Sequence, residues 1–168
     1  MAGPDRPPIE LHVQFATDAA GLPPDTDWEN PDFQAWVTAA FAGAGVMPDG
    51  GLTIRLVGLD EGTALNETWR RKTGPTNVLA FPGPAPGGAL PPGLPREYGD
   101  LVICLPVVAG EAARQGKKTR DHLTHLVVHG TLHLLGYTHD AETDAARMEA
   151  LETRVLATLG IPDPYVTK

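Results

Sequence analysis

Three histidines towards the C-terminal end restrict the fold more than any other feature of this sequence. His129 and His133 are four residues apart in a segment whose apolar spacing predicts a helix over residues 119–135. Four residues make slightly more than one helical turn, a rise of about 6 Å, so both imidazole rings leave the same face. Gly136 can end the helix in a left-handed turn at little steric cost. The chain can then reverse and bring His139 back towards the other two rings.

Converging imidazoles of this kind are typical of catalytic zinc sites. Zinc lies about 2 Å from each imidazole nitrogen, and three protein ligands leave the fourth tetrahedral position open for water. We therefore expect His129, His133 and His139 to bind one Zn²⁺ ion per chain and to form a hydrolytic site. His129 is expected to take part in catalysis as well as in metal binding.

The alternative is a histidine-rich helix face that is simply solvated, because His122 and His125 extend the same stripe. This alternative is favoured for any single histidine, whereas three at this spacing with a following glycine favour a metal site. We do not expect His122 or His125 to be ligands, although His125 could support one of them from behind.

Gly130 separates this site from the metalloproteases that it otherwise resembles in spacing. The pattern H-x-x-x-H-x-x-G-x-x-H matches the metzincin signature, but the residue after the first histidine is Gly130. Such proteases use a Glu at that position as general base. A peptidase is therefore the weakest interpretation of the site.

Periodicity along the chain predicts a single α+β domain. Alternating or continuous apolar runs predict strands over residues 9–15, 52–57, 76–81 and 98–104. Helical spacing predicts helices over residues 33–44, 60–69 (with Asp60 as a possible cap), 106–115, 119–135 and 141–159. We expect a four-stranded mixed sheet packed with about five helices, and the metal site on a C-terminal helix and its following turn. Residues 1–8 are predicted to be a disordered tail, residues 9–168 one domain, and the proline-rich residues 82–97 irregular.

Charge and composition limit the possible partners. The net charge is −8, which disfavours broad contact with a phosphate backbone. Two local basic clusters, at residues 70–72 and 117–120, remain available for phosphate binding. Cys104 is the only cysteine, so no internal disulfide can form. No apolar run approaches the roughly 20 residues of a membrane span, so we expect a cytoplasmic protein without a membrane partner.

The segment His129–His139, read as HGTLHLLGYTH, resembles the hallmark H-G-x-L-H-L-x-G-Y-x-H of the YbeY family of rRNA maturation endoribonucleases. The similarity covers about residues 50–165. Other segments that resemble the family are GDLVIC at 99–104, LNETWR at 65–70, PTNVLAFP at 75–82, MEALE at 148–152 and DPY at 163–165.

This resemblance implies a zinc-dependent, single-strand-specific endoribonuclease that acts in 16S rRNA 3′-end maturation and ribosome quality control. The implied partners are single-stranded rRNA, the small ribosomal subunit and assembly factors such as the Era GTPase, with no DNA partner. The resemblance also implies a functional arginine, which corresponds to Arg70 and would clamp the scissile phosphate. Two alternatives remain: a metal-dependent hydrolase of another substrate, and a non-catalytic ribosome assembly factor with a structural zinc.

Overall fold

A four-stranded mixed sheet forms the centre of the fold. The computed structural model describes residues 9–16, 32–83, 96–138 and 140–165. The strands are β1 (Glu10–Phe15), β2 (Gly50–Val57), β3 (Val78–Pro82) and β4 (Arg96–Cys104), in the order β1-β2-β4-β3. β1, β2 and β4 run parallel, whereas β3 pairs antiparallel with β4 at the edge. The predicted mixed sheet is thereby confirmed.

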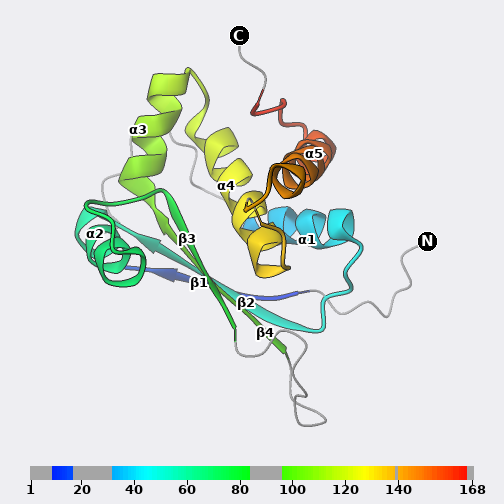
Figure 1. Cartoon of the computed structure of the whole chain (residues 1–168), viewed down its shortest axis with the longest axis horizontal. Coiled ribbons are helices and arrows are strands. Elements are labelled where there is room, and N and C mark those ends of the chain that lie inside the picture. Colours follow the sequence, from blue (N-terminus) through cyan, green and yellow to red (C-terminus); the bar gives the residue numbers. More distant parts are fainter. Residues whose placement is uncertain (1–8, 17–31, 84–95, 139, 166–168) are drawn as a thin grey trace.

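Within the described ranges, five α-helices and one π-helical segment accompany the sheet. They are α1 (Phe33–Ala44), α2 (Leu59–Leu65), η2 (Asn66–Arg70), α3 (Leu105–Gln115), α4 (Thr119–Leu134) and α5 (Glu142–Thr158). Figure 1 shows α1, α4 and α5 on one side of the sheet and α2 on the other. The single α+β domain with about five helices is confirmed. No helix in the described ranges is long and apolar enough to cross a membrane.

α4 is the central helix of the molecule. Its residues Leu123, Leu126 and Val127 pack with α1 against the sheet. Val128 and Leu132, on a different face of α4, pack against α5. Apolar neighbours therefore cover most of α4 and leave the face with the histidines as its boundary with the cavity described below.

The pleat of β3 sends alternate side chains to the two sides of the sheet edge. Val78 and Ala80 pair with Ile103 and Leu101 of β4, whose side chains belong to the core shared with α4. Leu79 belongs instead to the smaller core on the α2 side of the sheet, which Phe81 also contacts. Because β3 ends the strand order of the sheet, one of its long edges has no strand beside it in the described part of the chain.

Three local predictions need correction. The predicted helix over 60–69 is divided into α2 and η2, and Gly58 occupies the N-cap position in place of Asp60. Pro82 is the last residue of β3, and Arg96 and Glu97 are the first residues of β4, although residues 82–97 were expected to be irregular. Because Gly83 donates its N–H to the Tyr98 carbonyl of β4 at 3.0 Å, the preceding residue faces outward, where the missing N–H of proline costs no sheet hydrogen bond. The expected tail at 1–8 and residues 84–95 lie outside the described residues.

Candidate active site

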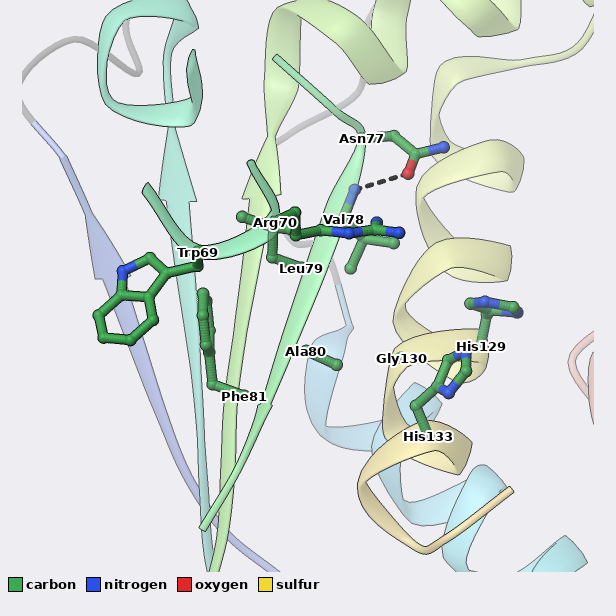
Figure 2. A pocket seen from close by; sticks show the side chains of 10 residues that line it. All are labelled: Trp69, Arg70, Asn77, Val78, Leu79, Ala80, Phe81, His129, Gly130 and His133. Carbon is green, nitrogen blue, oxygen red and sulfur yellow. Dashed lines mark hydrogen bonds between the residues drawn. The ribbon is translucent and has the colours of Figure 1, made fainter. Parts of the chain in front are cut away.

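A cavity of about 460 Å³ lies where η2, β3 and α4 meet. It is lined by Trp69 and Arg70 of η2, by residues 77–81 in and before β3, and by His129, Gly130 and His133 of α4. Figure 2 shows these side chains around the space between the sheet edge and the helix. The fold thus brings Arg70 to the same cavity as two of the predicted metal ligands.

His129 and His133 stand side by side on α4, as their spacing predicts. Their ring centroids are 4.7 Å apart and their planes are inclined by 76°. Both rings leave the helix on the same side in Figure 2. The third predicted ligand, His139, lies outside the described residues.

Arg70 is presented by the π-helical segment η2. Asn66, at the start of η2, is buried and donates its side-chain amide to the Gly74 carbonyl at 2.6 Å, which ties down the loop that follows. In Figure 2 the Arg70 side chain reaches across β3 towards α4. Within the part of the chain that the structure describes, no hydrogen bond or ion pair occupies its guanidinium group.

Trp69 points the opposite way from its neighbour Arg70. Its indole lies on the other side of β3 with its ring edge-to-face against Phe81, at a centroid distance of 5.9 Å and an angle of 76°. The Trp69 residue remains 65% exposed. The cavity therefore has a cationic side chain on one side of the sheet edge and an aromatic surface on the other.

Glu152 of α5 is a completely buried carboxylate next to the histidines. One of its oxygens contacts Nδ1 of His129. The other lies 3.2 Å from Nε2 of His125 and accepts a hydrogen bond from the Tyr165 hydroxyl. Burial alone would raise the pKa of Glu152, but the hydrogen bonds from His125 and His129 outweigh it and lower the pKa to about 2.

The same contacts affect Tyr165, which follows α5 in the sequence. Burial raises the pKa of its hydroxyl, and the hydrogen bond to the Glu152 carboxylate raises it further. The backbone N–H of Tyr165 donates to the Asp163 side chain at 2.8 Å, and Thr153 of α5 donates its hydroxyl to the same carboxylate at 3.4 Å, which holds the segment against α5. Tyr165 is therefore a proton donor to Glu152 at neutral pH.

His122 is buried and paired with a carboxylate of α3, away from the cavity. Its Nε2 lies 2.9 Å from the Glu111 carboxylate of α3, to which Asn77 also donates at 3.0 Å. Burial lowers the pKa of His122 in spite of Glu111. Asn77 in turn accepts the Val78 N–H at 2.6 Å, so this network fixes the start of β3.

The donor atoms of this region suit a metal ion. His125, His129 and Glu152 each offer a ligand atom, and these atoms lie within 4.8 Å of one another. Imidazole nitrogen and carboxylate oxygen are both ligands of zinc. The chain thus has residues able to hold a metal, and two placements compete: one on the cavity side with His133, the other on the Glu152 side with His125.

Sequence analysis assigned no role to Glu152 or Tyr165. Glu152 occupies a position in the apolar stripe of α5, between the buried Met148 and Val155. A charged residue in such a stripe is almost never buried unless it is paired. That pattern was the available signal for a partnered carboxylate, but it does not identify the partner.

Comparison with known proteins identifies the family. The family model described as Endoribonuclease YbeY matches residues 24–160. The chain belongs to the endoribonuclease YbeY family. An Endoribonuclease YbeY of Alkalilimnicola ehrlichii is 51% identical over 162 residues, covering 96% of this chain and 93% of that protein. Another YbeY, from Halorhodospira halophila, is 49% identical over 160 residues, covering 93% and 97%.

A solved structure supports the fold. The solution structure of a Thermotoga maritima protein matches with a TM-score of 0.52 and 22% identity, covering 94% of this chain and 99% of that one. At this identity the likeness extends to the arrangement of helices and strands alone. The YbeY assignment rests on the family model and on the sequence relatives.

Proposed function

We propose that this chain is a zinc-dependent, single-strand-specific endoribonuclease of 16S rRNA 3′-end maturation and ribosome quality control. Its family membership makes it a hydrolase that acts on RNA. The observation that carries the proposal is that Arg70 and the pair His129 and His133 line one cavity. A phosphate-binding group and a metal-binding group on the same cavity are what phosphodiester hydrolysis requires.

Arg70 would bind the scissile phosphate. Its guanidinium is always charged and can form two parallel hydrogen bonds with phosphate oxygens. Because the side chain has no internal ion pair among the described residues, it needs to break no contact to bind the substrate. It would also stabilise the negative charge that develops on the phosphate during cleavage.

His129, His133 and His139 would hold one Zn²⁺ ion. Bound zinc supplies Lewis-acid activation of water and of a phosphoryl oxygen. Position 130 is a glycine and offers no carboxylate that could act as a base. A side chain would not fit there, because a Cβ on Gly130 would lie 2.7 Å from Cδ2 of the buried Leu101. The helix therefore supplies imidazole ligands but no carboxylate at that place.

Trp69 supports the preference for single strands. An exposed aromatic ring can stack on an unpaired base, whereas the bases of a duplex are already stacked on one another. Arg71 and Lys72 follow directly and would attract the adjoining phosphates in spite of the acidic net charge.

The cellular setting is proposed from the family alone. The substrate would be single-stranded rRNA, and the partners the small ribosomal subunit and assembly factors such as the Era GTPase. The protein would act in the cytoplasm, with residues 9–168 as one domain and residues 1–8 as a tail.

The test is cleavage of an RNA hairpin with a single-stranded 3′ extension by purified protein. Wild type is expected to cut the extension and spare the duplex, and a chelator is expected to abolish cutting. His133→Ala and Arg70→Ala should each lower the rate by about 10²-fold or more, since each removes a group used in the transition state. Arg154→Ala, which removes an exposed cation of α5 that lies outside the cavity and outside both basic clusters, is the matched control and should cut nearly as wild type does.

Equal cutting by all variants would indicate a contaminating nuclease and would contradict the proposal. The absence of cutting by metal-loaded protein, on free RNA and on immature small subunits alike, would favour the non-catalytic assembly factor.

A further inference from the structure

We infer that Glu152 is a positioning residue that holds the His129 ring in one tautomer and orientation, with Nε2 directed away from α5 to the cavity. This inference rests on the proposed metal site. It selects between the two metal placements, because it makes Glu152 and His125 supports of the site and excludes them as ligands.

The first step is the state of the carboxylate. Glu152 has no exposed side-chain surface, and its two oxygens contact three groups that can donate a proton. A buried carboxylate is tolerated when it is ionised and its oxygens are satisfied in this way. All three neighbours must then act as donors: Nδ1 of His129, Nε2 of His125 and the Tyr165 hydroxyl.

The second step is the tautomer of His129. A neutral imidazole carries one proton, so a proton on Nδ1 leaves the lone pair on Nε2. The two nitrogens point away from each other across the ring. Because Nδ1 faces Glu152 and His129 lines the cavity, the lone pair is directed to the side where His133 stands. Imidazole ligands of metals are commonly fixed by a carboxylate in this way.

The third step weighs a metal ion between His129 and Glu152. Two ligand atoms that each lie about 2 Å from a tetrahedral zinc ion are about 3.3 Å apart. Nδ1 of His129 and Oε1 of Glu152 are in direct hydrogen-bond contact, closer than two ligands of one ion, so this arrangement favours the placement on the cavity side. His125, in the tautomer required here, has its lone pair on the buried Nδ1, which has no partner in the described ranges.

Tyr165 and His125 fix the carboxylate itself. Both contact Oε2, and the Tyr165 oxygen lies 3.4 Å from Nε2 of His125. With Oε2 held by two donors, Oε1 has one orientation, and among the residues that the structure describes His129 is the donor to it. The segment after α5 thereby contributes to the geometry of a ligand on α4.

The test measures zinc affinity by competition with a chromogenic chelator at pH 7. Glu152→Leu should weaken binding by about 10- to 100-fold, the usual cost of removing such a support. Glu152→Gln should retain more affinity than Glu152→Leu, because its amide oxygen can still accept the His129 proton. His133→Ala should lose tight binding altogether. His125→Ala should weaken binding only by about two- to fivefold, because it removes one of the two donors to Oε2 of Glu152 but leaves the His129 contact in place.

Tyr165→Phe guards against a folding artefact, because it removes one donor and leaves no large cavity. It should weaken zinc binding by about two- to fivefold, since Tyr165 contacts Glu152 and acts on His129 only through that carboxylate. Chemical denaturation of each metal-free variant identifies those that are folded, and the absorption spectrum of the Co²⁺-loaded protein should shift in Glu152→Gln.

The outcomes separate the two proposals. Loss of binding in His133→Ala together with unchanged binding in folded Glu152→Leu, or in Tyr165→Phe if Glu152→Leu does not fold, would overturn the positioning role and leave the proposed site intact. Equal and complete loss in Glu152→Gln, His125→Ala and the double variant would also overturn it, by showing that both are ligands. Unchanged binding in His133→Ala would instead overturn the proposed metal site itself.

Discussion

Trp69 and Arg70 are adjacent residues on opposite sides of β3, and the proposed function would give each of them a different part of the substrate to bind. Arg70 crosses β3 towards the histidines, and Trp69 lies on the other side against Phe81. A single-stranded RNA has the matching arrangement, with a charged backbone and flat bases that project to one side. The sheet edge would therefore separate the phosphate site from the base site.

Replacing Trp69 tests this division. Trp69→Ala should weaken binding of a single-stranded oligonucleotide by about 1–3 kcal/mol, the usual value of one stacked base. Trp69→Phe should recover part of the loss, since it keeps a smaller ring. Fluorescence anisotropy of a labelled oligonucleotide measures both, with Met47→Ala as a control for another exposed apolar side chain. Equal binding by wild type and Trp69→Ala would show that no base stacks there.

Sequence reasoning succeeded for residues on one helix and failed for contacts between helices. The four-residue spacing of His129 and His133 is a local property, and the structure places the rings together as predicted. Glu152 is 23 residues from His129 and contacts it only because α5 packs against α4 with Glu152 next to His129. The relative position of the two helices depends on how their side chains pack. The spacing of residues within one segment does not predict it. The roles of Arg70 and of all three metal ligands stay predictions.

At the scale of the element, α4 carries His129 and His133 of the candidate site and packs closely against β4 at Gly130. Gly130 allows α4 to approach β4, because any Cβ there would meet Leu101 at 2.7 Å. The same residue lines the cavity, so the close approach also sets the distance between the histidines and the strand.

A paired glycine experiment measures the importance of this approach. Gly130→Ala should destabilise the protein by about 1–3 kcal/mol, because the added methyl group overpacks a buried contact. Gly110→Ala, in the middle of α3, adds its Cβ 3.6 Å from the nearest atom and should stabilise by about 0.5–1 kcal/mol. Urea denaturation of the metal-free proteins compares the two. Stabilisation by both changes would show that α4 can shift away from β4 at little cost.

The elements themselves were largely predictable, and their exceptions have physical causes. Helix α1 begins and ends where it was predicted, at residues 33 and 44. Gly45 ends it in a left-handed conformation. The division of the predicted helix 60–69 into α2 and η2 has no signal in the apolar spacing, because a π-helical turn changes the backbone hydrogen bonds while the chain continues to coil. Asn66 stabilises the loop after η2 through a carbonyl eight residues later.

For the whole molecule, sheet order was the property least accessible to sequence. β2 and β3 are consecutive strands, yet β4 lies between them. Strand patterns predict which residues face a core, but the choice of neighbour depends on how the connecting helices pack. This insertion is what leaves β3 at the edge, next to the cavity.

The stability of the metal-free protein should depend on pH through Glu152. Its pKa in the folded state, about 2, is lower than the ordinary value of 4.5, a separation of about 2.5 units or roughly 3 kcal/mol. The unfolded chain therefore takes up the proton first as the pH falls, and this stabilisation is complete above about pH 5 and is lost towards pH 2.

Urea denaturation between pH 7 and pH 3, with chelator present, checks this dependence. The difference in unfolding free energy between wild type and Glu152→Gln should shrink as the pH falls below 5. Glu142→Gln, which removes an exposed carboxylate from the same helix, is the control. A constant difference between wild type and Glu152→Gln across the range would contradict an ionised, stabilising Glu152.

The dependence of His129 on Glu152 also has a consequence for biosynthesis. Arg70, β3 and α4 all precede α5 in the chain, so a ribosome makes the cavity wall before it makes the carboxylate that orients His129. Chains fold progressively from the N-terminus as they emerge. A nascent chain that lacks α5 and Tyr165 would hold the histidines without their orienting partner. Under the proposed function, nuclease activity would therefore arise late in translation, after Arg70 and β3 have already left the exit tunnel.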